Sequence, residues 1–307
     1  MAHVSRRGFL TAGGVSVGLW AAGSSLYADP LGMPMGFQLY GVREQASKDL
    51  VGTLRKVYAM GYTRVELCSF PAYAKSGFGP LADMKPVDIR KAIEDAGMRG
   101  ESCHFHYDQF LDSTIQQTID YAHGLGLRFM VISSPRQGAG RGDAGMDEWK
   151  WNFDLFNHAG RRVKEAGMQL AYHNHANEWK KIGGVLVFDE MLREVDPEYV
   201  QLQMDLGGVV SSGYDPVPYL ANNPGRFCSL HVKDGRPSAE APATTKGPQS
   251  GGGSSVVGSG VIDWKALFPA AKKGGIKNYF VEMEVRPPED PFEALEASYA
   301  YLHRLSV

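Results

Sequence analysis

The chain has 307 residues, of which 43% are hydrophobic and 21% are charged. This length is sufficient for one large hydrophobic core and is also compatible with two smaller domains. Lysine and arginine (32 residues) nearly balance aspartate and glutamate (34 residues), so the net charge is -2. Because no segment carries a basic stripe with interleaved aromatic residues, nucleic acid is excluded as an expected partner.

The first 28 residues have the pattern of an export signal. Arg6 and Arg7 precede an uncharged stretch at 11–27, which ends in small residues up to Ala28. The arginine pair resembles a twin-arginine signal, so we expect residues 1–28 to be a signal peptide and the protein to be periplasmic or otherwise exported. An uncleaved anchor is the alternative, but the stretch is glycine-rich and short for the roughly 20 residues that span a membrane. We expect no membrane association after removal of the signal, and one domain over residues 29–307.

A recurrent junction organises the rest of the chain. A helix-like segment ends at a glycine, and an apolar, strand-like run begins one residue later, as at Gly61, Gly97, Gly126, Gly167 and Gly275. Glycine readily takes the left-handed conformation that closes a helix, and a short loop can then lead into the next strand. The junctions therefore predict repeated helix-to-strand connections.

Reading outward from the junctions gives eight strands that alternate with helices. The expected strands are 36–40, 63–68, 98–106, 127–133, 168–175, 199–205, 226–233 and 276–284. Helical patterns include 86–96, 113–124, 147–166, 185–194, 263–273 and 290–304. This alternation indicates parallel βαβ units, and the count of eight favours a single (β/α)8 TIM barrel. An open doubly wound sheet would place a G-x-G-x-x-G turn after the first strand, whereas Gly41-Val42-Arg43-Glu44 follows Tyr40.

The three cysteines, Cys68, Cys103 and Cys228, lie far apart in sequence and each falls inside an apolar run. A sparse, odd-numbered set argues against a disulfide framework, even in an oxidising compartment. We expect buried thiols that serve as small apolar residues.

Two long connections, 70–85 and 235–260, are expected to be loops at the active-site face. The second is rich in Gly, Ser, Pro, Ala and Thr, but a domain boundary there would separate the last βα unit from the barrel. The hydrophobic loop at 70–85 leaves room for a second subunit that covers the mouth in a homo-oligomer.

Polar residues gather at the carboxyl ends of the expected strands, where TIM barrels carry their chemistry. These ends contain Glu66, Cys103-His104-Phe105-His106, Tyr172-His173-Asn174-His175, Asp205, His231-Val232-Lys233-Asp234 and Val281-Glu282-Met283-Glu284, with Glu178 soon after the fifth strand. Because side chains alternate across a strand, the histidines of each His-x-His pair share a face. Five of the nine histidines fall at these ends, and buried charges there would need a partner. A divalent cation, Mn²⁺, Mg²⁺, Co²⁺ or Zn²⁺, suits carboxylate and imidazole ligands.

These segments resemble the sugar phosphate isomerase/epimerase superfamily of xylose-isomerase-like barrels, over nearly the whole mature chain. The most specific motifs are Tyr172-His173-Asn174-His175-x-x-Glu178-Trp179, His231-Val232-Lys233-Asp234, Gly258-x-Gly260-x-Ile262-Asp263-Trp264 and Val281-Glu282. The resemblance implies one metal held by an acid on strand five and by Asp205, His231 and Glu282. Many relatives read Leu-Glu-Asn-His at strand five, so either His173 replaces the acid or Glu178 reaches in from the loop.

Four acids also have simpler explanations. Glu178 could be a solvated loop acid, and Asp205 could be a helix cap, although Leu206-Gly207-Gly208 is a poor first turn for a helix. Glu66, like Glu284, could form a rim ion pair with Arg64, Arg286 or Lys233.

The resemblance implies abstraction of a proton next to a carbonyl, with the resulting enediolate stabilised by the metal. Our main hypothesis is a sugar isomerase or epimerase; the alternative is a lyase or dehydratase that eliminates from a keto-sugar, keto-glycoside or inosose. The candidate catalytic residues are Glu282, His104, His106, His175, Lys233 and Glu66. Aromatic residues that could stack on a sugar ring are Phe70, Tyr73, Phe78, Phe105, Tyr107 and Trp179.

Two further hypotheses compete with sugar chemistry. Phosphodiester cleavage, as in endonuclease IV, would need several metals and a basic groove, which a slightly acidic exported chain does not favour. A non-catalytic sugar-binding barrel would have lost the metal. The sequence therefore predicts a metal-dependent enzyme that acts on a small-molecule sugar or polyol.

Overall fold

The computed structural model describes residues 29–136, 145–235, 256–284 and 289–306. The expected signal peptide and most of the loop at 235–260 lie outside the described residues, so the leader and the export route stay predictions. Within the described ranges, no helix has both the length and the apolar character needed to cross a membrane.

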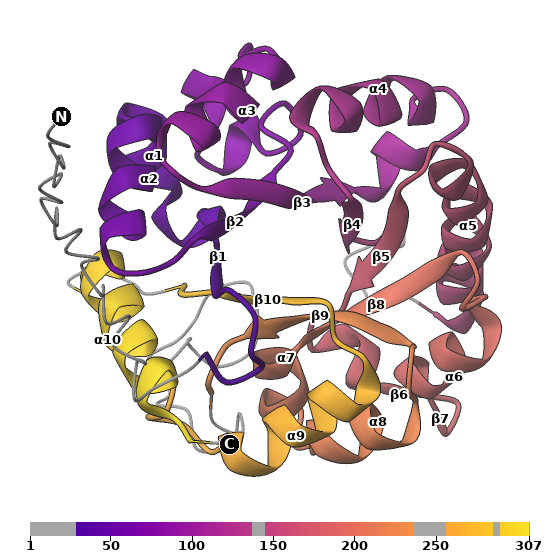
Figure 1. Cartoon of the computed structure of the whole chain (residues 1–307). Helices are drawn as coiled ribbons and strands as arrows, with labels where there is room; N and C mark the ends of the chain where they lie inside the picture. The colour runs from indigo at the N-terminus through magenta and orange to yellow at the C-terminus, as the bar shows by residue number, and fades with distance from the viewer. Residues whose placement is uncertain (1–28, 137–144, 236–255, 285–288, 307) are drawn as a thin grey trace, which may run out of the picture.

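Eight parallel strands close into a barrel, and helices surround it (Figure 1). The strands are β1 (Gly36–Gln38), β2 (Arg64–Cys68), β3 (Arg99–His106), β4 (Phe129–Ser134), β5 (Gln169–His173), β8 (Val200–Asp205), β9 (Phe227–Val232) and β10 (Asn278–Val281). They follow chain order around the barrel, and Phe37 pairs with Val281 where the last strand meets the first. The prediction of a single (β/α)8 TIM barrel is confirmed, and each expected strand overlaps an observed one.

The outer layer consists of ten described helices. They are α1 (Arg43–Lys48), α2 (Leu50–Ala59), α3 (Pro86–Asp95), α4 (Ile115–Leu125), α5 (Met146–Glu165), α6 (Val187–Glu194), α7 (Leu206–Ser211), α8 (Pro216–Asn222), α9 (Trp264–Gly274) and α10 (Pro291–Arg304). A small antiparallel hairpin, β6 (Lys181–Ile182) with β7 (Val185–Leu186), follows β5. Short 3₁₀ turns occupy Leu39–Val42, Ala74–Ser76, Gly79–Leu81, Tyr107–Phe110 and Asn177–Trp179. The helices expected from the sequence are present as α3, α4, α5, α6, α9 and α10.

The glycine junctions do what the sequence predicts. Gly126 closes α4 with a φ of 75°, and Gly275 closes α9 with a φ of 87°. Side-chain caps fix the other end of several helices; the Asp263 carboxylate, for example, accepts hydrogen bonds from two backbone N–H groups in the first turn of α9. Helix ends are therefore specified locally, and the short connections set the strands side by side.

The barrel interior changes from apolar to polar along the strands. Phe129, Val131, Ala171 and Cys228 form a small buried cluster. Because side chains alternate along a strand, the residue two positions after Ala171, His173, points to the same interior, closer to the carboxyl ends. The apolar layer therefore supports a polar layer at the end where the candidate site lies. All three cysteines are free and buried, as predicted.

Candidate functional site

A pocket of about 250 Å³ opens at the carboxyl ends of the barrel strands. It is lined by Tyr40, Cys68, Tyr73, Ser76, His104, His106, Ser133, Ser134, His173, His175, Glu282 and Glu284. The structure therefore brings together both predicted His-x-His pairs and both acids of the last strand end. Tyr73 comes from the loop at 70–85, which confirms that this loop borders the active-site face.

Four buried side chains converge beside this pocket, and we call them the ligand cluster. The potential ligand atoms of His173, Asp205 and Glu282 all lie within 4.8 Å of one another. His231 joins them because its Nδ1 lies 3.1 Å from Oε2 of Glu282. His173, Asp205 and His231 lie at the carboxyl ends of β5, β8 and β9, and Glu282 directly follows β10; these strands are consecutive in the barrel, so one wall of the interior supplies the whole cluster.

Glu66 and Gln203 lie deeper in the barrel and form what we call the polar floor. Gln203 precedes Asp205 by two residues on β8, so both side chains point to the interior and Gln203 lies below. The Glu66 carboxylate is fully buried. Its hydrogen-bond partners are Gln38 at 2.9 Å, Gln203 at 2.8 Å, Ser102 and Nε2 of His231. His104 Nε2 lies 3.1 Å from Glu66 and 2.8 Å from Gln203 Oε1, so this imidazole also rests on the floor.

In and beside the polar floor, burial and the neighbouring charges shift the pKa values in opposite directions. Burial alone would raise the pKa of Glu66, but the neighbouring His104 and His231 outweigh it and hold this pKa well below its usual range. Burial would lower the pKa of His231, yet Glu66 and Glu282 raise it to about 10. In the absence of a bound cation, His231 is therefore a buried imidazolium between two carboxylates.

The two carboxylates of the ligand cluster respond differently to burial and to the neighbouring cations. Burial raises the pKa of Asp205, and Lys233 only partly opposes this effect. Burial would also raise the pKa of Glu282, but Lys233 and His231 lower it well below its usual range. The Lys233 Nζ lies 3.2 Å from Glu282 and 2.6 Å from Glu284.

The chemistry of this donor set fits a divalent metal ion. Two carboxylates and two imidazoles are the ligands that Zn²⁺, Co²⁺ and Mn²⁺ take in proteins, and a cation would stabilise the ionised form of Asp205, which burial opposes. In the described ranges the three cysteines are separate, buried thiols. Cys68 lines the pocket and its thiol contacts Gln38 Oε1 at 3.7 Å, whereas the ligand cluster itself offers only nitrogen and oxygen atoms.

Asp205 is a helix cap, contrary to our expectation. One carboxylate oxygen of Asp205 accepts a hydrogen bond from the Gly207 amide at 2.9 Å, so Asp205 is the N-cap residue of α7. A Cβ on Gly207 would lie 2.9 Å from Cδ of Lys233, and one on Gly208 would lie 2.8 Å from the backbone of His175. The two glycines are therefore required for close packing rather than chosen for helix propensity. Asp205 both caps α7 and belongs to the ligand cluster.

Of the other simple explanations for single acids, those for Glu178 and Glu66 are wrong and that for Glu284 is confirmed. Glu178 is buried, and its carboxylate accepts hydrogen bonds from the Tyr172 hydroxyl and the His175 amide, so it is neither solvated nor part of the ligand cluster. Glu66 lies inside the barrel rather than at the rim, and Arg64 pairs with Glu101 at 3.3 Å instead. The expected rim pair of Glu284 with Lys233 is present.

Most aromatic candidates for sugar stacking belong to the core. Phe70, Phe78 and Phe105 are at most 1% exposed, and Phe70 stacks on Phe78 within the loop. Trp179 stacks on Phe188 of α6 with 4.2 Å between ring centroids. The hydrophobic composition of the loop at 70–85 is thus explained within one chain, and a second subunit over the mouth stays a prediction.

Sequence reasoning missed the polar residues that surround Glu66. Gln38, Ser102, Gln203 and Ser229 are all buried and join its hydrogen-bond network. A signal was present, because Gln203 interrupts an apolar strand two residues before Asp205 and so points to the same face.

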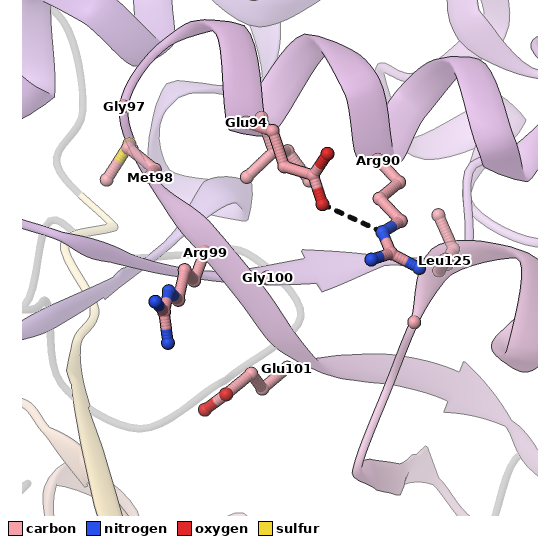
Figure 2. Close-up of a pocket in the computed structure, with 10 residues that line it drawn as sticks. Arg90, Glu94, Gly97, Met98, Arg99, Gly100, Glu101 and Leu125 are labelled. Atoms are coloured by element: carbon pink, nitrogen blue, oxygen red, sulfur yellow. Dashed lines mark hydrogen bonds and ion pairs between the residues drawn. The ribbon is translucent and has the colours of Figure 1, made fainter.

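A second hollow, of about 540 Å³, lies at the opposite end of the barrel (Figure 2). It forms where α3 and α4 end and β3 begins, and Arg90 on its wall donates a 2.8 Å hydrogen bond to Glu94. Arg99 and Glu101 line the same hollow. It is remote from the strand ends that carry chemistry in TIM barrels.

The sequence profile of a family described as the xylose isomerase-like TIM barrel matches residues 54–304. The chain belongs to this family. Among curated members, an inosose dehydratase of Geobacillus thermodenitrificans is 31% identical over 159 residues, which cover 50% of this chain and 52% of that protein. An inosose dehydratase of Lacticaseibacillus casei is 27% identical over 197 residues, 59% of this chain and 64% of that protein. The matches thus span between half and two thirds of these relatives.

Solved structures of other proteins show the same architecture. A sugar phosphate isomerase/epimerase from Parabacteroides distasonis superposes with a TM-score of 0.73 and 28% identity, covering 92% of this chain and 96% of that one. A structure of the IOLI protein with a bound zinc atom superposes with a TM-score of 0.63 and 15% identity over 87% of this chain and 96% of its own. The second likeness concerns the fold alone.

Proposed function

We propose that this protein is a divalent-metal-dependent lyase that removes the proton next to a carbonyl of a sugar or cyclitol and then eliminates water. The observation that carries the proposal is the buried ligand cluster beside a pocket that also holds two half-buried histidines, His106 and His175. The similarity to inosose dehydratases supports elimination over isomerisation. This ranking reverses our expectation from the sequence, which placed isomerase or epimerase first.

The ligands that we propose are His173, Asp205, His231 and Glu282. His173 takes the position of the acid that relatives carry on strand five, and Glu178 is held elsewhere by the Tyr172 hydroxyl and a backbone amide. When bound, the ion would polarise the carbonyl of the substrate and so acidify the adjacent C–H bond. We propose Glu282 as a ligand and not as the base, because coordination would engage its carboxylate, whose Oε2 also contacts Lys233 and His231.

Two proton transfers are assigned to the half-buried histidines. Burial lowers the pKa of His106, so the neutral form that can accept a proton is favoured. We propose His106 as the base and His175 as the acid. As the C–H electron pair forms the new C=C bond, the C–O bond at the β-carbon breaks, and the hydroxyl leaves as water with the proton from His175.

Lys233 and His104 are proposed as positioning groups. Glu282 and Glu284 hold Lys233 in its charged form beside the ligand cluster, where its Nζ donates to both carboxylates and so orients Glu282. His104 directs Nε2 to Glu66 and Gln203, so that nitrogen is engaged inside the barrel rather than offered to substrate. Glu66 is likewise buried and is not proposed to contact substrate.

The test is incubation of the metal-loaded protein with inososes, 3-keto-glycosides and free keto-sugars in deuterated water, followed by NMR and mass spectrometry. We expect loss of one water from a carbonyl substrate, abolished in His106→Asn and retained in the matched control His158→Asn, whose imidazole is exposed on α5 and pairs with Asp112. Absence of both elimination and deuterium exchange with every carbonyl substrate would overturn the proposal.

The isomerase or epimerase alternative has one specific observation in its favour. The Parabacteroides distasonis sugar phosphate isomerase/epimerase covers nearly the whole chain, whereas the dehydratase matches are partial. Under this alternative the same experiment gives deuterium next to the carbonyl, or an epimer, without loss of water. That outcome would rule out the elimination of water and retain the proposed proton abstraction.

We also propose that the protein is exported by the twin-arginine route. The support is Arg6-Arg7 followed by the uncharged stretch up to Ala28. Export would favour free or oxidised sugars, glycosides and cyclitols as substrates over phosphorylated sugars of the cytoplasm.

A further inference from the structure

The polar floor contacts one nitrogen of each imidazole in the ligand cluster. We propose that Glu66 and Gln203 are positioning residues that fix the tautomers of these imidazoles, so that His173 presents Nε2 and His231 presents Nδ1 to the metal. This inference rests on the proposed metal site. It assigns different ligand atoms to two histidines that the sequence alone makes equivalent.

The amide of Gln203 has a fixed orientation. Its nitrogen lies 2.8 Å from Oε1 of Glu66 and 3.1 Å from the hydroxyl oxygen of Ser229. A carboxylate can only accept hydrogen bonds, so the nitrogen end of the amide must face Glu66. The amide oxygen is therefore directed to the imidazoles as an acceptor.

His173 meets this oxygen with Nδ1, at 3.0 Å. Because an amide oxygen cannot donate, Nδ1 must carry the hydrogen, and the lone pair of neutral His173 is then on Nε2. The 3.0 Å contact therefore specifies the nitrogen that remains for an ion. Nε2 of His104 approaches the same oxygen at 2.8 Å and shares it.

The second imidazole, His231, contacts Glu66, the other residue of the polar floor. Its Nε2 hydrogen-bonds to Oε2 of Glu66. Glu66 is already the acceptor for Gln38, Ser102 and Gln203, which leaves it ionised and makes His231 Nε2 the donor. The remaining nitrogen, Nδ1, lies 3.1 Å from Glu282 within the ligand cluster, where an ion can replace its proton.

Glu66 therefore acts on both imidazoles. It bonds His231 directly, and it orients the Gln203 amide that bonds His173. Carboxylates that accept from the distal nitrogen of a ligating histidine raise its basicity and fix its ring, and their loss typically weakens metal binding by about 10- to 100-fold. A glutamine at position 66 would point an amide nitrogen at groups that already donate.

The experiment uses the whole mature protein labelled with ¹⁵N and loaded with Zn²⁺. Long-range ¹H–¹⁵N correlation spectra distinguish the protonated from the metal-bound nitrogen of each histidine. We expect His173 with hydrogen on Nδ1 and His231 with hydrogen on Nε2. Coordination of His231 through Nε2 in the wild type would overturn the inference without any variant.

The matched pair of variants is Glu66→Gln and Glu101→Gln. Both substitutions remove a carboxylate charge from neighbouring barrel strands, but Glu101 pairs with Arg64 at the far end of the barrel. We expect Zn²⁺ affinity, measured by competition with a chelator, to fall about 10- to 100-fold in Glu66→Gln only, with altered histidine tautomers. Equal affinity in both variants would overturn the positioning role, whereas a wild type that binds no ion would overturn the metal proposal itself.

Discussion

Asp234 joins the end of β9 to the segment that carries the Gly258-x-Gly260 motif, and this junction gives a quantitative prediction. The buried carboxylate accepts hydrogen bonds from the Gly235 amide at 3.0 Å, the Gly258 amide at 2.9 Å and the Trp264 indole at 3.1 Å. A Cβ at Gly260 would lie 1.9 Å from the same carboxylate. Close approach to Asp234 therefore explains why glycine occupies position 260.

The expected cost follows from the donors that each substitution leaves behind. Asp234→Ala leaves the buried Gly235 amide and Trp264 indole without an acceptor, at about 1–3 kcal/mol for each group, so we expect a loss of about 2–6 kcal/mol in the free energy of unfolding. The Gly258 amide adds little, because Gly258 is exposed and water can replace the carboxylate. Trp264→Phe removes one hydrogen-bond donor and leaves the Asp234 carboxylate with its two other donors, so we expect a loss of about 1–2 kcal/mol in the free energy of unfolding. The double variant lacks both the carboxylate and the indole, so no indole is left unpaired. Its loss in the free energy of unfolding should therefore be about 1–2 kcal/mol smaller than the sum of the losses in the two single variants.

The assay is urea denaturation of the wild type, both single variants and the double variant, followed by far-ultraviolet circular dichroism. This signal is insensitive to the lost indole, unlike tryptophan fluorescence. If the slope of the free energy of unfolding against urea concentration is unchanged, each variant unfolds from the same native state. Additive losses, or a loss below about 1 kcal/mol for Asp234→Ala, would refute the view that this carboxylate holds the segment in place.

Three further predictions concern the pocket and the leader. Because burial lowers the pKa of His106 from 6.5 and the neutral form is the proposed base, the acidic limb of kcat/KM should lie below pH 6.5; persistence of this acidic limb in His106→Asn would exclude His106 as its origin. Gly208→Ala should cost about 1–3 kcal/mol in urea unfolding, since its Cβ would lie 2.8 Å from the His175 backbone, and an unchanged midpoint would contradict the close-packing explanation of α7. Replacement of Arg6 and Arg7 by lysine should retain a tagged protein in the cytoplasm, as shown by cell fractionation, and continued export would refute the proposed route.

Regular features of the sequence predicted the barrel and much of the pocket. Helix-closing glycines such as Gly126 mark their own position, because the left-handed conformation is local and needs no knowledge of tertiary contacts. Alternation along a strand placed His104 with His106 and His173 with His175, and both pairs line the pocket. Local rules therefore sufficed wherever a residue's role depends on its own strand.

Roles that depend on other strands were beyond these rules. The sequence makes Glu66 a candidate catalytic residue, with a rim ion pair as the alternative, but its surroundings come from β1, β3, β8 and β9, which only the closed barrel brings together. The cap at Asp205 was discounted because Gly207-Gly208 is a weak helix start, and tertiary packing against Lys233 and His175 overrides that propensity. Gln203 carried no charge to draw attention, although its amide organises two imidazoles.

The central claim is that His173, Asp205, His231 and Glu282 hold one divalent ion. A crystal of the mature protein grown with Zn²⁺ or Mn²⁺, with diffraction measured on both sides of the absorption edge of that metal, tests it most directly. We predict a single anomalous peak bound by these four side chains, with Glu178 still hydrogen-bonded to Tyr172. A peak coordinated by Glu178, or no peak at the ligand cluster, would contradict the account.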